Sequence, residues 1–481
     1  RETWRLVVQL ALPGLEFSDA LVHERQDLCG MAALKSAAYA AGSGVRENSS
    51  SALLPSGTPF HEYVPRSGRI VTAARRTAAG TREPLDQLVW PQHRLYEALR
   101  RSDESVANRF LPDAALRRDA GPTFIFPRNL EPNEDDPHSL DNPRFPFVEG
   151  NSWIGFVHAD ISGLGEVWRD ISAAEQTATS PSPEHALSIS SEIERALTRA
   201  AGRATEAVLL PSASTTLYPG AGVALVPARP LVLGGDDLTV IVRSDLALAF
   251  TRRLLEAIEE ETWKAFESLR NDPSLAHLTA KLPHHLSACA GIAFARSSQP
   301  FQMTSTLSEA LCKFAKKDAK RHFSPYPSAI AFHTVSTTLH EDFEQTVLAV
   351  ELTLPDQRRL TAQPLFLAAV GSHPTCEAFD RLVLFLAAQE KGRGKLRNLR
   401  AELFADPEAA NESWRRWREV ARREGADLKK LDTILRDLNC GELFDERVPF
   451  REGSPSASPL FDALQLIDLG HATALRNGEP K

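Results

Sequence analysis

The segment that most constrains this chain runs from Leu231 to Val242 and reads LVLGGDDLTVIV. Two apolar runs of β-prone residues flank a Gly-Gly-Asp-Asp turn, a pattern that predicts a β-hairpin with Asp236 and Asp237 at its tip. Adjacent carboxylates repel each other, so such a pair usually requires a cation. Oxygen ligands on a tight turn suit Mg²⁺ or Mn²⁺, with substrate phosphates completing the shell. An ordinary polar turn is the alternative interpretation.

The composition is that of a globular chain with room for several domains. Its 481 residues are 42% apolar and 25% charged, and the net charge of −8 gives no overall basic field that would attract nucleic acid. The five cysteines are scattered and form no Cys-x-x-Cys pair, which argues against a zinc site and a disulfide framework and favours a cytoplasmic location. No apolar run is long enough to span a membrane, so we expect no membrane partner.

Changes in composition divide the sequence into four parts. Residues 1–110 predict an α/β region, with a strand over 4–12 and helices over 20–41 and 91–101. Residues 111–151 are dense in Pro, Asn and Asp and predict a linker. Residues 152–335 show the sharpest pattern, and residues 336–481 predict a C-terminal helical domain.

The third part predicts an α+β fold of the ferredoxin-like (palm) type. We expect strands at 153–160, 222–233, 238–243, 286–295 and 329–333, and helices after Gly165 and at 183–206, 245–269 and 306–321. Pro227 and Pro230 are expected to confine the first hairpin strand to its last few residues. A central hairpin between strand–helix units is the ferredoxin-like order with additions. In that topology Asp160, at the end of the first strand, lies beside Asp236 and Asp237.

Three carboxylates at two adjacent strand ends fit a two-metal site for nucleotidyl transfer. One ion activates an attacking hydroxyl, and the other holds the triphosphate and stabilises the leaving pyrophosphate. The alternative for Asp160 is a residue that ends its strand or caps the next helix. His158 shares a strand face with Asp160. For His158 we favour a packed, hydrogen-bonded histidine over one that tunes the site or accepts a proton.

Several stretches then occur in a fixed order: Asp160-Ile161-Ser162-Gly163-Leu164-Gly165, Gly234-Gly235-Asp236-Asp237, the strand AGIAFA at 290–295 and the helix end FAKKDAK at 314–320. Together they resemble the palm domain of the CRISPR polymerase family, the large subunit of type III CRISPR effector complexes. That family is related to GGDEF diguanylate cyclases and class III nucleotide cyclases. The resemblance covers about residues 153–333, and the chain looks like a compact variant with no recognisable HD nuclease motif.

The resemblance implies that the chain converts ATP into cyclic oligoadenylate-type second messengers in antiviral defence, with two Mg²⁺ or Mn²⁺ ions as cofactors. By the matched motif, Asp160 and Asp236 would hold the metals, Asp237 would assist, and the carbonyl of Ile161 would be a further ligand. ATP or another nucleoside triphosphate is the expected partner. RNA, other CRISPR-type subunits and a second copy of the chain are the further partners that the resemblance leaves open.

The matched motifs also imply nucleotide contacts. Gly234 and Gly235 would let the backbone approach the nucleotide, and Ser162 and Gly163 would lie against it, with Ser162 where a second acid is usual. Lys316 and Lys320 would contact the triphosphate. A solvated helix face is the alternative for both lysines.

Two other functions remain open from the sequence. A non-catalytic palm could serve as a scaffold for RNA or a CRISPR-type partner, although clustered carboxylates that repel each other disfavour it. A diguanylate-type cyclase is the second, and it is disfavoured because Leu238 follows the turn where that family has an acid. The Trp414–Arg418 helix and the basic run 391–400 suggest RNA contacts, with a packed helix and a plain basic surface as the alternatives.

Overall fold

The computed structural model describes residues 71–76, 82–86, 105–112, 115, 122–127, 129–130, 143–148, 151–177, 182–218, 220–335, 342–389, 393–441, 445–453 and 455–478. The chain divides into two units, Arg1–Ser105 with Glu134–Asp136, and Val106–Asn133 with Pro137–Lys481. In the first unit, β1 (Val71–Arg76) and β2 (Arg82–Asp86) pair antiparallel, a hairpin that the sequence pattern did not predict. The strand predicted at 4–12 and the helices predicted at 20–41 and 91–101 lie outside the described residues.

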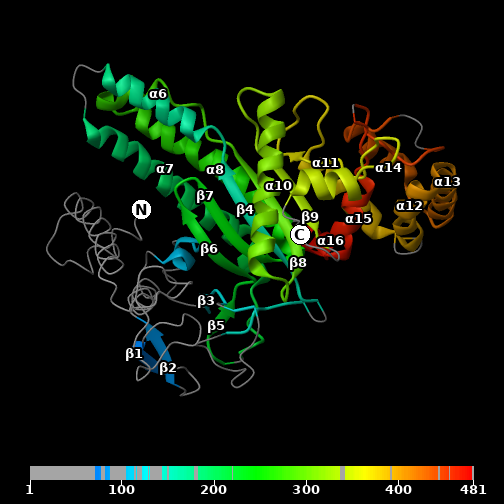
Figure 1. Ribbon diagram of the computed structural model, residues 1–481, viewed down its shortest axis with the longest axis horizontal. Coiled ribbons are helices and arrows are strands. Elements are labelled where there is room, and N and C mark those ends of the chain that lie inside the picture. The colour runs from blue at the N-terminus through cyan, green and yellow to red at the C-terminus, as the bar shows by residue number, and fades with distance from the viewer. Residues whose placement is uncertain are drawn as a thin grey trace, which may run out of the picture. The chain divides into compact units, whose positions relative to one another are not determined.

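A mixed six-stranded sheet forms the centre of the second unit, which makes this unit α+β (Figure 1). The strand order is β10-β9-β8-β4-β7-β6. Only β8 and β9 are parallel neighbours, and the other neighbouring pairs are antiparallel. The strands are β4 (Trp153–Ile161), β6 (Ala228–Gly234), β7 (Asp237–Arg243), β8 (Ala288–Arg296), β9 (Ala329–Thr334) and β10 (Leu365–Phe366).

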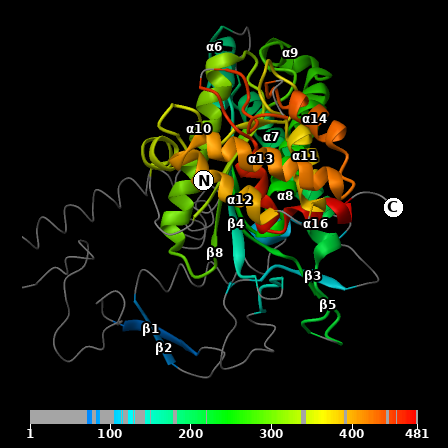
Figure 2. The same ribbon diagram turned by 90° about the vertical axis from the view of Figure 1, so that its right-hand side faces the viewer.

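Helices cover both faces of this sheet. On one face, α8 (Ser244–Arg270) comes so close that a Cβ at Gly155 of β4 would lie 2.5 Å from the Cβ of Ala247. On the other face lies α10 (Phe301–His322), which packs against β8 (Figures 1 and 2). It comes so close to Gly291 that a Cβ there would lie 2.0 Å from the backbone oxygen of Ser308. Burial on both sides explains why β8 reads ACAGIAFAR, apolar at every position but the last.

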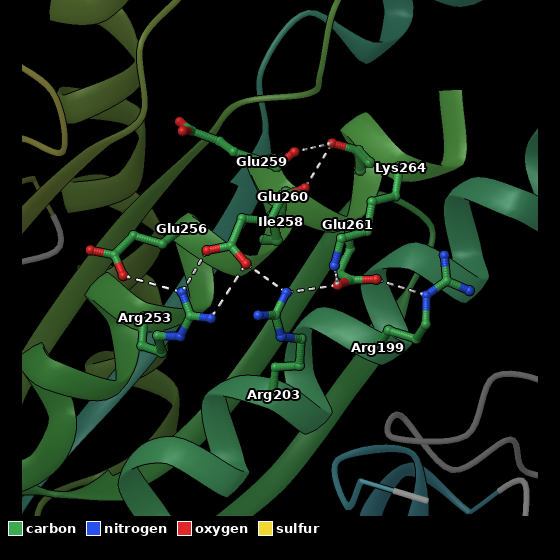
Figure 3. A network of polar contacts seen from close by, with 10 residues as sticks. Arg199, Arg203, Arg253, Glu256, Ile258, Glu259, Glu260, Glu261 and Lys264 are labelled. Carbon is green, nitrogen blue, oxygen red and sulfur yellow. Dashed lines mark hydrogen bonds and ion pairs between the residues drawn. The ribbon is translucent and has the colours of Figure 1, made fainter. Parts of the chain in front are cut away.

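The helix α7 (Pro183–Ala204) packs along α8 through a network of arginines and glutamates (Figure 3). Glu261 of α8 has a nearly buried side chain and accepts hydrogen bonds from Arg199, Arg203 and Lys264. Burial acts to raise the pKa of Glu261, but these hydrogen bonds outweigh it and hold the pKa below its usual range. The network therefore fixes α7 on α8 with ionised groups.

Most predicted elements of this part are confirmed. Besides the strands and helices above, α6 (Leu164–Gln176) follows β4, and Ser182 caps α7 by accepting a hydrogen bond from the Glu184 amide. The prediction about the prolines was wrong, because β6 already begins at Ala228 and continues through Pro230 with a register shift between Pro230 and Val232. A proline fits there because β6 stands at the end of the strand order, where one side of the strand needs no donor.

Part of the predicted linker 111–151 belongs to the second unit. Within it, β3 (Thr123–Ile125) pairs parallel with β5 (Val223–Leu225). The predicted division into four parts otherwise stays a prediction. The remaining short elements of this region are α4 (Val106–Arg109), the π-helix Thr205–Leu209, the 3₁₀ helices Leu210–Ser212 and Pro273–Leu275, and α9 (Ala276–Thr279).

The chain after Phe343 is mostly helical, as predicted, but it also contributes β10 to the sheet. Its helices are the π-helix Phe343–Glu351, α11 (Cys376–Ala388), α12 (Arg393–Ala405), α13 (Pro407–Arg423), α14 (Leu428–Asp437), α15 (Leu460–Asp468) and α16 (His471–Gly478). They lie together at the right of Figure 1. Across the described residues, no helix combines the length and the apolar character needed to cross a membrane.

A buried aspartate ties α15 to the segment before β10. Asp462 accepts hydrogen bonds from the Thr361 hydroxyl at 3.1 Å, the Ala362 amide at 2.9 Å and the Gln363 side chain at 2.9 Å. Burial raises the pKa of Asp462 to about 7, although all three hydrogen bonds act to lower it. This carboxyl therefore changes charge near neutral pH.

Candidate functional site

The three predicted aspartates lie at one end of two neighbouring strands. Asp160 is the register partner of Asp237 across the β4–β7 pair. Asp236 occupies the turn between β6 and β7, and its carbonyl oxygen accepts a hydrogen bond of 3.2 Å from the Ile161 amide. The backbone thus brings the Asp160 motif and the Gly-Gly-Asp-Asp turn together, although more than seventy residues separate them in sequence.

Lys316 connects two of the oxygen groups that were expected to bind metal. Its ammonium lies 2.7 Å from Oδ2 of Asp160 and 3.0 Å from the carbonyl oxygen of Ile161. The side chains of Lys316 and Asp160 are 21% and 28% exposed, so this contact is partly shielded from water. A cationic group therefore already lies between a carboxylate and a carbonyl oxygen that point at the same place.

Asp237 lies in an electrostatic field set by four neighbours. Burial raises its pKa; the carboxylates of Asp236, Asp160 and Glu309 raise it further, and His158 opposes them. Nε2 of His158 is 4.0 Å from Oδ1 of Asp237, and its Nδ1 is 3.2 Å from the Thr239 hydroxyl. His158 is thus a packed, hydrogen-bonded histidine, as favoured from the sequence, and it also faces the acids.

Glu309 was missed by the sequence analysis. It is half-buried on α10 and adds a fourth carboxylate to the field around Asp237. The signal that could have found it is its spacing: Glu309 and Lys316 are two helical turns apart, so they share one face of α10. That face of α10 therefore presents an acidic residue, Glu309, and a basic residue, Lys316, to the end of the sheet.

The three aspartates do not form a ready-made metal cluster. Among the described residues, a single group brings three potential ligand atoms within 4.8 Å of one another, and the aspartates do not belong to it. Repulsion between carboxylates keeps such groups apart when no cation joins them. A pocket of about 10 Å³, the space of one water-sized sphere, borders the three aspartates but is lined mainly by apolar side chains, including Leu197 of α7 and Ile258 of α8. This pocket is therefore too small to hold a ligand larger than a water molecule.

The glycines of both motifs leave this surface open. Gly163, directly after the strand end, has φ of 76°, and Gly235 in the turn has φ of 66°, both in the left-handed region that favours glycine. Gly234 and Gly235 are exposed, and a Cβ at either position would meet no atom within 4 Å. The backbone of the turn is accessible to a large ligand.

Two other predicted nucleotide contacts point elsewhere. The Ser162 hydroxyl is buried at 3.6 Å from Sγ of Cys289, and its amide donates to the Ser287 carbonyl at 2.8 Å. Lys320 lies over the ring of Tyr326, 5.2 Å from its centroid, and the Tyr326 hydroxyl donates to Glu166. The structure therefore brings Lys316, but not the Lys320 ammonium or the Ser162 hydroxyl, against Asp160.

The aromatic and basic motifs near the C-terminus are largely engaged within the fold. Trp414 and Trp417 are buried and stack on each other at 5.0 Å, so the packed-helix interpretation is confirmed. Arg418 is buried and pairs with Asp432 and Asp445. In the basic run 391–400, residues 391 and 392 lie outside the described part, Arg397 pairs with Asp468, and Arg400 donates to the Glu351 carbonyl at 3.1 Å.

No protein-family model matches this chain, and no curated protein is similar to it. Any functional proposal therefore depends on the residues and their geometry.

Proposed function

We propose that this chain is a palm-type nucleotidyltransferase of the CRISPR polymerase kind, which joins nucleoside triphosphates, ATP in the first instance, into cyclic oligoadenylate-type second messengers for antiviral defence. The observation that carries the proposal is the contact of the Lys316 ammonium with both Asp160 Oδ2 and the Ile161 carbonyl, beside the register pair of Asp160 and Asp237. These oxygens are the ones that the sequence motif assigns to metal.

The donor set fits a hard divalent cation. Carboxylate and carbonyl oxygens are the ligands that Mg²⁺ and Mn²⁺ prefer, and two such oxygens already surround a positive charge. Asp160, the Ile161 carbonyl and Asp236 would hold the ions, with Asp237 assisting. When bound, the ions would activate the attacking hydroxyl and stabilise the leaving pyrophosphate.

The other residues of the site position the substrate. The open backbone of Gly234 and Gly235 would admit the phosphates to the turn. Once a metal binds the Asp160 carboxylate and the Ile161 carbonyl, the Lys316 ammonium would turn to the triphosphate. The carboxylate would then pair with the metal and the ammonium with the phosphates.

The strand order supports a palm. Counted along the chain, β4, β6, β7 and β8 lie in the order β8-β4-β7-β6 with antiparallel neighbours, and this is the arrangement of a ferredoxin-like β-α-β-β-α-β fold. On this interpretation β9 and β10 are additions at one edge. In that topology the end of the first strand lies beside the central hairpin, and here Asp160 at the end of β4 pairs with Asp237 of the hairpin.

One observation favours the second function, a non-catalytic scaffold. The carboxylates of Asp160, Asp236 and Asp237 do not bring one oxygen each to within 4.8 Å of one another. A palm kept for binding RNA or a protein partner would have no need for such convergence. Activity measurements separate the two functions.

The test is to incubate the full chain with each labelled nucleoside triphosphate and Mg²⁺ or Mn²⁺ and to resolve the products by mass. Cyclic adenylate products are expected from ATP, and a guanine dinucleotide would identify a diguanylate-type cyclase instead. Because an unknown activator could be required, binding is measured in parallel: ATP with Mg²⁺ should raise the melting temperature, and EDTA should abolish the increase. If no product forms and the nucleotide does not raise the melting temperature, the non-catalytic scaffold is the function that remains.

The decisive variant is Asp236→Asn, with Asp170→Asn on the exposed face of α6 as its matched control. Turnover should fall by at least about a hundredfold in the first and stay unchanged in the second, because loss of a metal ligand removes several kcal/mol of transition-state stabilisation. Stability should not fall, since the change removes one of several repelling carboxylates. A product rate near that of the wild type would exclude Asp236 as an essential ligand.

A further inference from the structure

A cluster of two histidines and a glutamate lies where three helices meet, away from the aspartates. Glu175 is near the C-terminal end of α6, His185 is in the first turn of α7, and His277 is on α9. The α6 and α9 helices lie at the same end of the second unit (Figure 2). Since α6 has 13 residues and starts beside the Asp160 motif, the cluster is about 20 Å, one helix length, from that motif.

The three side chains converge on one point. Nδ1 of His185 is 3.2 Å from Oε1 of Glu175, and Nε2 of His277 is 3.1 Å from Oε2 of the same carboxylate. One ligand atom from each residue lies within 4.8 Å of the other two, and this is the group of three noted above. The side chains are 17%, 21% and 34% exposed for Glu175, His185 and His277, so the cluster is shielded but reachable from solvent.

The charges around the cluster favour a cation. The carboxylate of Glu175 accepts a hydrogen bond from the Ser182 backbone N–H and contacts a ring nitrogen of each histidine. Asp272 interacts electrostatically with His185, so a second carboxylate lies near the cluster. The positive end of the α7 dipole opposes a cation here, and Glu175 and Asp272 together offset it.

We propose that Glu175, His185 and His277 bind one zinc ion, with water in the fourth position. Two imidazole nitrogens and one carboxylate oxygen are a ligand set for zinc rather than for Mg²⁺, which prefers oxygen alone. Tetrahedral zinc with bonds of 2.0–2.1 Å places its donor atoms about 3.3 Å apart. Each histidine nitrogen already lies about that far from one oxygen of Glu175, His185 from Oε1 and His277 from Oε2. Since only one of these oxygens is the ligand, the other two separations among the three ligand atoms are at most 4.8 Å and have to shorten by no more than about 1.5 Å.

The sequence gives no sign of this site. The scattered cysteines argued against zinc, but that argument applies to thiolate ligands, and these ligands are imidazoles and a carboxylate. Glu175 is 10 residues from His185 and 102 from His277, a spacing without a motif. A bound ion would hold the end of α6 to α7 and α9, and because α6 begins at the Asp160 motif, it would also stabilise that end of the sheet.

The test uses the full chain, stripped with a chelator and dialysed against Zn²⁺ in buffer with excess Mg²⁺, which occupies oxygen-only sites. Metal content is then measured by mass spectrometry. Wild type should retain about one zinc per chain. Glu175→Gln and His277→Gln should bind zinc at least about tenfold more weakly, since even the loss of a residue that only supports a ligand has that effect. His284→Gln, the same substitution on an exposed histidine outside the cluster, should bind like the wild type.

X-ray absorption at the zinc edge of the wild type keeps the test decisive if a variant does not fold. The expected shell contains imidazole nitrogens and oxygen at about 2.0–2.1 Å, without the sulfur at about 2.3 Å that a cysteine ligand would give. Wild type without zinc, a shell with sulfur, or folded His277→Gln with wild-type affinity would each overturn the proposal. Because the site is independent of the aspartates, none of these results bears on nucleotidyl transfer.

Discussion

Substitution of Gly291 tests the contact that places α10 over the sheet. A Cβ at this position would lie 2.0 Å from the backbone oxygen of Ser308 and 2.5 Å from the backbone nitrogen of Cys312. Both atoms belong to the helix backbone, so no side-chain rotation relieves the overlap. Since real Cβ atoms essentially never come within 3.0 Å of such atoms, Gly291→Ala must move α10 away from β8 by at least 1.0 Å.

The energetic cost follows from that displacement. A gap of 0.5–1 Å forfeits about a quarter to a half of the dispersion energy of each contact it opens, and Leu307, Leu311 and Ala315 of α10 are all buried. Overpacking costs about 1–3 kcal/mol, and a backbone clash belongs at the upper end. Removal of a strand glycine returns up to about 1 kcal/mol. We therefore expect the free energy of unfolding to fall by about 2 kcal/mol.

Urea unfolding measures this change, and hydrogen exchange locates it. Amides of α10 should exchange faster in Gly291→Ala, and the Lys316–Asp160 contact of 2.7 Å should weaken because Lys316 moves with its helix. Gly394→Ala is the control, since a Cβ there meets nothing within 4 Å and alanine favours a helix by up to about 1 kcal/mol. An unfolding free energy of Gly291→Ala within about 0.5 kcal/mol of the wild type would refute the close packing of α10.

Two further predictions concern charged groups. Lys316→Met should tighten Mg²⁺ binding in the absence of nucleotide, because it frees the Asp160 carboxylate and the Ile161 carbonyl. It should also weaken ATP binding by about tenfold or more. Titration calorimetry measures both affinities, and weaker Mg²⁺ binding in the variant would contradict the proposed role of the lysine. For Asp462, the folded pKa of about 7 lies above the ordinary 3.8, so the protonated form favours the folded state. Its contribution, on the order of 4 kcal/mol, is present in full below about pH 4 and is lost as pH rises through about 7. The unfolding free energy of wild type relative to Asp462→Asn should therefore fall between about pH 4 and 8, and a flat difference would show that Asp462 does not titrate there.

The sequence predicts the elements around the site well because local signals agree there. The strand ending at Asp160, the hairpin at 231–242 and the long apolar stripe of α8 each have a clear period. The glycine turn and the alternation of side chains fix which residues face which side, so the meeting of Asp160 and Asp237 could be predicted from the sequence alone. Where the sequence pattern and the topology agree, the positions of the elements can be predicted without knowledge of tertiary contacts.

The parts that the sequence does not predict depend on contacts between distant segments. The β10 strand has two residues and exists because β9 offers an edge to it, and Glu309 matters because α10 crosses the sheet next to the turn. Likewise, Pro227 and Pro230 were expected to confine the first hairpin strand to its last few residues, but β6 begins at Ala228 and runs through Pro230 at the edge of the sheet. The contact of Lys316 with the Ile161 carbonyl could not be predicted, since a carbonyl carries no signal in the sequence.

The position of β6 also has a consequence for edge-to-edge pairing with other strands. Among the described strands, β6 has a neighbour on one side only, and its turn presents Asp236 to solvent. An edge strand of this kind is a template for other chains, yet Pro230 lacks a donor and the register shift beside it bends the strand. A straight row of hydrogen-bonding groups is therefore not offered to an incoming strand. The turn can stay bare enough for a large, charged ligand to reach its backbone, while the strand that carries it resists edge-to-edge aggregation.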